Sequence, residues 1–399
     1  RSQQTATHRP RRTDMLKADK VLTIRLLDRV VSAIAATKPS RTVEIDLSAC
    51  ERAGPFTEGR LIQVCATAFQ QNVQLVFRIG RRVSPTEGTG LTWLESSAIG
   101  FILANSRVTI LDSEASDVSR DLRYHHLDRA TASAGITFDP AEQCLWAGAA
   151  DNEPITPCAS DLLSMPLDAP FSAFPGFHRL LSDALKTVGG SVFEQIGLNQ
   201  WLDRFAFECI QNTTKHARYS IAGRPLIGAR MLVIRRLSSR DGISEFGFGV
   251  RQYFEQLTEL FGAAAVKDLF EITIADSGEG IPARYLKSSH VYGTLDERSE
   301  LSAIQEAMVL RRSSEQGRHG GGAGLYAALH AVSNTAGLLH VTTGRLKVFK
   351  HYLPGQKSFP ELSLHPTTPG LRPLGRGTVM TFVVPALARP QSNHGDTSF

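Results

Sequence analysis

The sequence predicts an α/β protein of the α+β class, in which a smaller α/β unit precedes a larger one. Residues 42–77 read as strand, helix and strand, which is the pattern of a βαβ unit. Residues 269–275 alternate like a strand and end in a glycine-rich turn. A second glycine cluster, at 318–326, runs directly into a helical pattern.

Length and composition indicate an ordinary soluble protein with two or three domains. The chain has 399 residues, of which 42% are hydrophobic and 21% charged. No apolar run approaches the roughly 18 residues of a membrane span, and no secretory signal opens the chain, so no membrane partner is expected. The five cysteines form no C-x-x-C pair, which argues against a zinc site or disulfide framework and predicts a cytoplasmic protein with reduced thiols.

The positive charge is concentrated at the N-terminus. The net charge is +5, and the first twenty residues hold six basic and two acidic side chains. We expect residues 1–20 to be a disordered basic tail, because a polar, charged segment cannot bury enough apolar surface to fold. Nucleic acid is not indicated as a partner beyond this tail.

Residues 21–150 are predicted to form the smaller α/β unit. A buried helix is expected over 21–36, strands over 42–47, 73–77 and 107–111, and a helix over 55–71. The adjacent His125 and His126 point to different sides of a helix or a strand and are expected to be a surface pair. The proline-rich residues 151–175 are expected to be a linker.

Ile45-Asp46-Leu47-Ser48, followed by a short loop and an amphipathic helix, resembles the STAS-type domain of anti-anti-sigma factors. The resemblance implies a scaffold or partner-recognition role. In that family a phosphorylatable serine begins the helix, whereas this chain has Pro55 there. Thr57 could replace the serine, but a helix N-cap is the role that we expect for Thr57.

An amphipathic helix that ends near His216 is predicted by apolar residues that recur at roughly helical spacing, namely Phe205, Cys209, Ile210 and Ala217. This helix carries Glu208 and Asn212, which are four residues apart and therefore project from one face. By itself this pair is compatible with an ordinary solvated helix face. The strand at 269–275 ends at Asp276, whose carboxylate can accept a hydrogen bond from an exocyclic amine. Gly278 and Gly280 follow, and glycine lets the backbone approach a flat ligand closely.

The cluster at 318–326 opens a helix, and unpaired N–H groups there suit phosphate. It contains no G-K-[ST] of a Walker loop and does not open a βαβ unit in the Rossmann pattern. Finally, Gly377-Thr378 introduces a strand that ends at Pro385.

In this order, E-x-x-x-N, D-x-G-x-G, G-x-G-x-G-L and G-T resemble the GHKL ATPase superfamily, which contains gyrase B, MutL, histidine kinases and anti-sigma factor serine kinases. The resemblance covers about residues 176–388, leaves 389–399 as a tail, and implies a two-layer α/β sandwich with a mixed sheet. It implies that Asn212 coordinates Mg²⁺, that Glu208 deprotonates the attacking water, and that Asp276 binds the adenine amine with Thr378 assisting. The other positions that the resemblance places at ATP are Lys215, His216, Gly278, Gly280, Gly320, Gly322, Gly324 and Leu325.

The expected function is Mg²⁺-dependent ATP binding with slow hydrolysis. Closure of a lid at about 282–319 would then switch a protein partner or a second subunit. Glu208 favours hydrolysis, because histidine kinases generally carry Asn at the equivalent position. Two alternatives stay open: a serine or histidine protein kinase of the anti-sigma type, and a nucleotide sensor that does not hydrolyse ATP.

Overall fold

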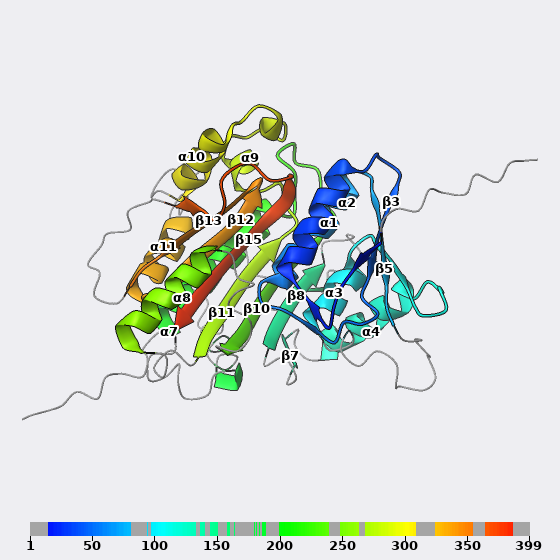
Figure 1. Cartoon of the computed structure of the whole chain (residues 1–399), viewed down its shortest axis with the longest axis horizontal. Helices are drawn as coiled ribbons and strands as arrows, with labels where there is room; N and C mark the ends of the chain where they lie inside the picture. Colours follow the sequence, from blue (N-terminus) through cyan, green and yellow to red (C-terminus); the bar gives the residue numbers. More distant parts are fainter. Residues whose placement is uncertain are drawn as a thin grey trace, which may run out of the picture.

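The chain forms a four-stranded and a nine-stranded β-sheet with helices packed against both, which confirms a mixed α/β fold (Figure 1). The computed structural model describes residues 15–80, 94, 97–132, 136–139, 144–150, 158–159, 163, 179, 181, 183, 186–188, 199–238, 248–262, 268–308, 324–353 and 364–385. In these residues every strand pair of the small sheet is parallel and every pair of the large sheet is antiparallel.

The N-terminal unit contains the small sheet, whose strand order is β1-β3-β5-β6, and a short β2–β4 pair. The strands are β1 (Leu16–Lys17), β2 (Val21–Leu22), β3 (Thr42–Asp46), β4 (Arg52–Ala53), β5 (Gln74–Arg78) and β6 (Thr109–Leu111). The helices are α1 (Ile24–Ala36), α2 (Thr57–Gln70), α3 (Ala98–Asn105) and α4 (Ser119–Ala132). The strands and helices predicted between residues 22 and 78 are thus confirmed, with small shifts of their ends.

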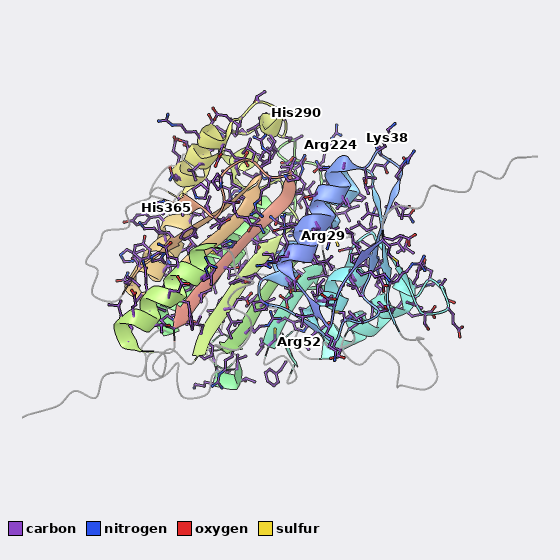
Figure 2. All side chains as sticks on the ribbon, viewed as in Figure 1. Arg29, Lys38, Arg52, Arg224, His290 and His365 are labelled. Carbon is purple, nitrogen blue, oxygen red and sulfur yellow. The ribbon has the colours of Figure 1, made fainter. Side chains whose placement is uncertain are left out.

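Helix α1 shows why the apolar periodicity of the sequence predicted a helix correctly. Thr23 caps it by accepting a hydrogen bond from the Leu26 backbone N–H, at 3.3 Å. Its larger apolar residues recur at helical spacing and most are buried, namely Leu26, Leu27, Val30, Val31 and Ile34, whereas Arg29 is exposed on the outward side (Figure 2).

The large sheet has the order β14-β13-β12-β15-β11-β10-β8-β7, with β9 paired to β8. Its strands are β7 (Ile136–Asp139), β8 (Cys144–Ala150), β9 (Cys158–Ala159), β10 (Ala229–Ser238), β11 (Asp268–Asp276), β12 (Leu338–Gly344), β13 (Leu346–His351), β14 (His365–Pro366) and β15 (Gly375–Pro385). The helices of this part are α7 (Asn199–His216), α8 (Phe248–Phe261), α9 (Ile281–Tyr285), α10 (Glu297–Ala307) and α11 (Gly324–Asn334), with a 3₁₀ turn η4 (Val291–Gly293).

Both faces of the large sheet are covered. Even-numbered residues of β11, such as Ile272 and Ile274, pack with α7 and α11 in one apolar cluster. On the other face, Ala275 of β11 and Val379 of β15 belong to the core of the N-terminal unit, which includes α1, α2 and α3. Helix α8 lies on this second face as well, where Tyr253 packs with residues of β11, β12, β13 and β15.

This arrangement differs from the predicted two-layer sandwich with a mixed sheet. The second face also carries apolar residues, such as Val233, Leu269 and Val383, so it requires cover, and α2, α3 and α8 supply a third layer. The large sheet also includes β7 and β8, which lie within residues 21–150, the segment assigned from sequence to the first unit. The apolar run of β8 is buried on both sides, because one face packs in the core of the N-terminal unit and the other in the core that contains α7.

Two local predictions were wrong. The N-cap of α2 is Phe56, with φ 61°, and Thr57 is the first helical residue and completely buried. Tertiary contacts hold Phe56 there: its N–H donates to Glu271 Oε1 at 3.2 Å, and its ring stacks on His340. His126 is not on the surface, because its side chain is 1% exposed and its Nε2 lies 2.9 Å from the Leu94 carbonyl oxygen.

Among the helices that the structure describes, none combines the length and the apolar character needed to cross a membrane.

Candidate functional site

Helix α7 carries Glu208 and Asn212, and its apolar side packs on the large sheet. The Phe205 ring lies 5.0 Å from the Phe382 ring of β15, and Cys209 Sγ lies 3.8 Å from Met380 Sδ of the same strand. Phe205, Cys209 and the neighbouring Ile210 are buried, which confirms the predicted amphipathic helix. The polar pair therefore occupies a defined position relative to β15.

Glu208 is a buried carboxylate with a cationic neighbour. Its side chain is 9% exposed, and one oxygen lies 2.5 Å from Arg204 Nη2, one helical turn earlier. Burial raises the pKa of Glu208, and the charges of Arg204 and Lys215 oppose that rise. A carboxylate whose pKa is shifted toward neutrality is suited to taking up a proton.

Asn212 follows Glu208 by one turn and is half-buried. Its Nδ2 is shielded from solvent and has no hydrogen-bond partner among the residues that the structure describes. A buried amide without a partner is costly, so it marks a place where a ligand could bond. Lys215 and His216 lie in the last turn of α7, and Lys215 Nζ donates to Gln211 Oε1 at 3.3 Å.

Asp276 ends β11, beside Thr378 of β15 on one side and Arg230 of β10 on the other. Its Oδ1 accepts hydrogen bonds from the backbone N–H of Gly278 at 2.8 Å and of Thr378 at 3.2 Å. Burial raises the pKa of Asp276 to about 6, although the two N–H groups favour the ionised form. The carboxylate is therefore held in one orientation by its own loop and by the neighbouring strand.

The glycines after Asp276 allow the end of α7 to come close. A Cβ atom on Gly278 would lie 3.0 Å from the Cα of Ala217, the residue after α7. Gly280 has φ 86°, and a Cβ there would lie 2.7 Å from the Tyr292 hydroxyl. The structure thus brings the predicted E-x-x-x-N helix and the predicted D-x-G-x-G turn together.

The sequence analysis missed Thr343, which ends the neighbouring strand β12. Its hydroxyl accepts a hydrogen bond from the Ile281 N–H at 2.9 Å and lies 3.4 Å from the Thr378 hydroxyl. Thr343 is paired with Thr378 in the sheet, and Thr378 is paired with Asp276 on its other side, so the three residues form a row across β12, β15 and β11. The signal that could have revealed it is a polar pair, Thr342-Thr343, before a glycine at the end of an apolar strand.

Two charged residues near Asp276 were also missed. Arg230 is 3% exposed, and its Nη1 donates to the Thr214 hydroxyl of α7 at 2.8 Å. Glu279 accepts bonds from the Ile221 N–H at 2.8 Å and from the Ser289 hydroxyl at 2.7 Å. It therefore joins the segment after α7 to the segment after α9. An arginine at a buried position of an alternating strand was the available signal for Arg230.

The structure describes only part of the predicted glycine loop. Gly320, Gly322, Arg311, Arg312 and Arg318 lie outside the described residues. Gly324 is the first residue of α11, and Leu325 is partly buried against the core that α11 shares with α7. The loop therefore enters a helix that packs beside α7, but the structure does not test the phosphate role of its glycines.

No cluster of three or more His, Cys, Asp or Glu side chains that could hold a metal ion occurs in the described part of the chain. No protein-family model, curated protein or solved structure matches the chain.

Proposed function

We propose that the chain binds ATP with Mg²⁺ and hydrolyses it slowly, and that the nucleotide state controls a protein partner through the N-terminal unit. The observation that carries this proposal is the packing of Ala217 on Gly278. This contact places a helix that bears a buried carboxylate and an unpartnered amide beside a strand end that bears a second, oriented carboxylate.

Asp276 would read the adenine. Its Oδ1 is engaged by two backbone donors, and its other oxygen has no hydrogen bond in the described residues, so it can accept one from the exocyclic amine. Guanine carries a carbonyl where adenine carries that amine, so the same carboxylate would disfavour guanine nucleotides. The hydroxyls of Thr343 and Thr378, 3.4 Å apart, add polar groups beside the carboxylate.

Asn212 would hold Mg²⁺ through its side-chain oxygen, while its Nδ2, a donor without a partner in the described chain, would bond a phosphate oxygen. Amide and carboxylate oxygens are hard ligands of the kind that Mg²⁺ prefers. When bound, the ion would neutralise phosphate charge. Lys215, in the last turn of the same helix, adds a cation near the end of α7.

Glu208 would act on water. As the water oxygen bonds to the γ-phosphorus, the bond from phosphorus to the ADP oxygen breaks and the water proton passes to the Glu208 carboxylate. The raised pKa of Glu208 suits this step, and Arg204 holds the carboxylate in place. Slow turnover is expected, because the water must also be positioned by the lid.

Phosphate release measured for wild type, Glu208→Gln and the control Glu259→Gln tests the proposal. Glu259 is exposed on α8, so its variant should keep the wild-type rate. Glu208→Gln should bind ATP normally and lose at least about 100-fold in turnover, the lower end for loss of a general base. Equal turnover by wild type and Glu208→Gln contradicts the hydrolytic role, and absence of ATP binding by wild type contradicts the whole proposal.

The alternative of a protein kinase has its own readout, namely labelled γ-phosphate on a protein. Thr57, the residue in this chain nearest to the serine of STAS-type domains, is completely buried and bonds the Gly54 carbonyl. Label on Thr57 would therefore require α2 to open. Label appearing in the chain or on a partner, in place of free phosphate, would decide for the kinase.

A further inference from the structure

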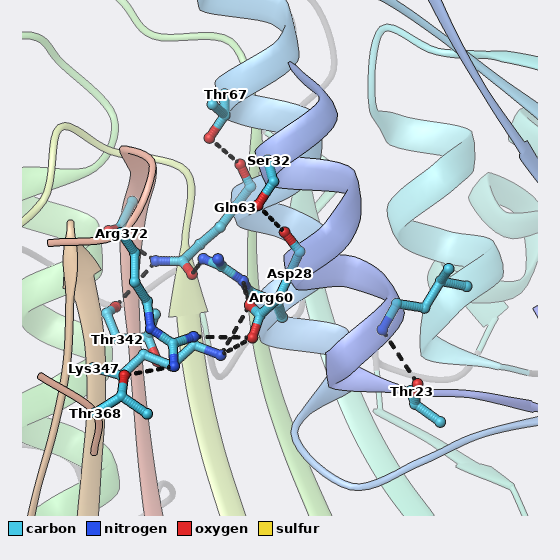
Figure 3. A network of polar contacts seen from close by, with 12 residues as sticks. Thr23, Asp28, Ser32, Arg60, Gln63, Thr67, Thr342, Lys347, Thr368 and Arg372 are labelled. Atoms are coloured by element: carbon cyan, nitrogen blue, oxygen red, sulfur yellow. Dashed lines mark hydrogen bonds and ion pairs between the residues drawn. The ribbon is translucent and has the colours of Figure 1, made fainter. Parts of the chain in front are cut away.

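Helix α2 of the N-terminal unit contacts the strands beside the candidate site through the side chain of Gln63, which Figure 3 shows directed from α2 toward Thr342. Gln63 is completely buried between α2 and the large sheet. Its Nε2 donates to two backbone carbonyls, that of Thr342 on β12 at 3.0 Å and that of Gly377 on β15 at 3.2 Å. Each carbonyl belongs to the residue just before a threonine of the candidate site.

The bond to Gly377 joins Gln63 directly to the surroundings of Asp276. The Gly377 carbonyl and the Thr378 N–H belong to the same peptide group. Gln63 donates to the oxygen of that group, and the N–H of the group donates to Asp276 Oδ1 at 3.2 Å. Because the peptide group is planar and rigid, a displacement of its oxygen also moves the donor that orients Asp276.

The bond to Thr342 acts on the second threonine. Thr343 follows directly, and its hydroxyl accepts from the Ile281 N–H just after the glycine turn. The sheet pairs Thr343 with Thr378. The Gln63 amide therefore bonds both β12 and β15, at the residues that directly precede Thr343 and Thr378.

The orientation of the Gln63 amide is set by residues of the N-terminal unit. Arg60 Nη1 donates to Gln63 Oε1 at 2.8 Å, which leaves Nε2 for the two carbonyls. Arg60 Nε is in turn held by Asp28 of α1 at 2.9 Å. One turn beyond Gln63, the Thr67 hydroxyl accepts from the Arg376 N–H of β15 at 2.9 Å. Figure 3 shows Asp28, Arg60, Gln63 and Thr342 in this sequence from α1 to β12.

We infer that Gln63 is a positioning residue for adenine recognition, and that through it the N-terminal unit sets the affinity of the site for ATP. This inference rests on the proposed function. The contacts form a continuous set of hydrogen bonds from α1 to Asp276, and a physical coupling of this kind is reciprocal: a change in α2 alters nucleotide affinity, and nucleotide alters the stability of α2.

Dissociation constants of ATP and GTP, measured by titration calorimetry with Mg²⁺, test the inference on wild type and Gln63→Met. Methionine has nearly the same volume as glutamine but no donor. ATP affinity should fall at least fivefold, the lower limit of a typical coupling of about 5- to 150-fold. GTP affinity should stay within twofold of the wild-type value, so the ratio of the GTP to the ATP dissociation constant should decrease. A general loosening of the fold would weaken both nucleotides together.

The matched control is Gln70→Met, the same substitution on an exposed position of α2, which should keep both dissociation constants. Thr67→Val is the second test if Gln63→Met does not fold, because it keeps the shape and removes the acceptor for the Arg376 N–H, together with the hydroxyl that donates to the Gln63 backbone carbonyl at 2.6 Å. Thr67→Val should also decrease the ratio of the GTP to the ATP dissociation constant.

Amide hydrogen exchange gives an independent readout. ATP should slow exchange in residues 57–70 of wild type, and this protection should be lost in Gln63→Met or Thr67→Val. Wild type that binds ATP, together with variants that keep the wild-type ATP-to-GTP ratio and the protection of α2, overturns the inference alone. Wild type that binds neither nucleotide overturns the proposed function instead.

Discussion

Thr378 and Asp276 face each other across β15 and β11, and the Thr378 backbone N–H donates to Asp276 Oδ1 at 3.2 Å. A residue near the beginning of β15 therefore orients the carboxylate that ends β11. A carboxylate that is already oriented binds its ligand with a smaller free-energy cost, because its surroundings need not reorganise around the ligand. Its protonation state then becomes the variable that the solution can change.

Nucleotide affinity should depend on pH through Asp276, whose pKa burial raises to about 6. An amine donor on adenine favours the ionised carboxylate, so binding lowers the pKa of Asp276. The dissociation constant should therefore be constant above about pH 7 and rise as pH falls below about 6, by at most about tenfold per pH unit.

Titrations between pH 5 and 8 check this prediction, with adenosine as a second ligand because it lacks phosphate groups that titrate near pH 6. Asp276→Asn should bind weakly at every pH and show no such dependence. An affinity for adenosine that is the same at pH 5 and pH 7.5 in wild type contradicts the role of Asp276.

The ion pair between α2 and the large sheet should be essential for stability. Arg235 of β10 contacts Glu58 of α2, and its Nη1 lies 3.7 Å from Glu271 Oε2 of β11, with all three side chains at most 5% exposed. Arg235→Met removes the only cation of this group in the described chain and leaves two buried carboxylates together. We expect a loss of about 3–5 kcal/mol in the free energy of unfolding.

Urea unfolding measures that loss, with Arg29→Met as the control because Arg29 is exposed on α1. The control should change the unfolding free energy by less than about 0.5 kcal/mol. Because burial raises the pKa of Glu271 to about 7, lowering the pH should partly restore the Arg235 variant by protonating a carboxylate. Equal losses in the two variants would refute a special role of Arg235.

Gly59 marks the closest approach of α2 to the sheet. A Cβ atom there would lie 2.5 Å from Val379 Cγ1 and 3.2 Å from Ala275 Cβ. Gly59→Ala should destabilise by about 1–3 kcal/mol through overpacking, although alanine favours a helix by about 1 kcal/mol. Removing the opposing methyl groups in Gly59→Ala/Val379→Ala should relieve the clash, so the double variant should be more stable than the sum of the single changes allows. Simple additivity in thermal unfolding would contradict the contact.

Lys347 should make stability increase with pH. Burial, with the nearby positive charges of Arg60 and Arg372, lowers the pKa of Lys347 from 10.5 to about 7, while Asp28 opposes that shift. Between these values the unfolded chain binds more protons than the folded chain, so the unfolding free energy should rise with pH, by up to about 1.4 kcal/mol per pH unit.

The comparison of wild type with Lys347→Met isolates this effect, because other titrating groups are common to both proteins. Urea unfolding at pH 7, 8 and 9 should give a smaller rise with pH for the variant than for wild type. The same pH slope in both proteins would show that Lys347 keeps its ordinary pKa.

Local pattern was sufficient for the main elements of the chain. The alternation of residues 42–47 predicted β3, the spacing of Phe205, Cys209 and Ile210 predicted α7, and the run from Gly375 to Pro385 predicted β15. Glu208, Asn212, Asp276 and Thr378 were also singled out from sequence, because each belongs to a short motif at the end or on the polar face of such an element.

Contacts between distant segments could not be predicted from the local sequence pattern. Phe56, and not Thr57, is the N-cap of α2, and Glu271, far along the chain, accepts a hydrogen bond from the Phe56 N–H. His126 is buried because the Leu94 carbonyl lies beside it. The second face of the large sheet carries apolar residues whose cover, α2 and α3, comes from the N-terminal unit.

The sequence by itself determined the main helices and strands, such as β3, α7 and β15, and the polar residues that they carry, because those properties depend on neighbours within a few residues. Only the tertiary structure decided that β7 and β8 join the large sheet, that Arg230 lies beside Asp276 and Thr343 beside Thr378, and that Gln63 bonds the peptide group that orients Asp276. These contacts join residues up to 314 positions apart, and their geometry is fixed by the packing of α2 on β15 rather than by any local pattern.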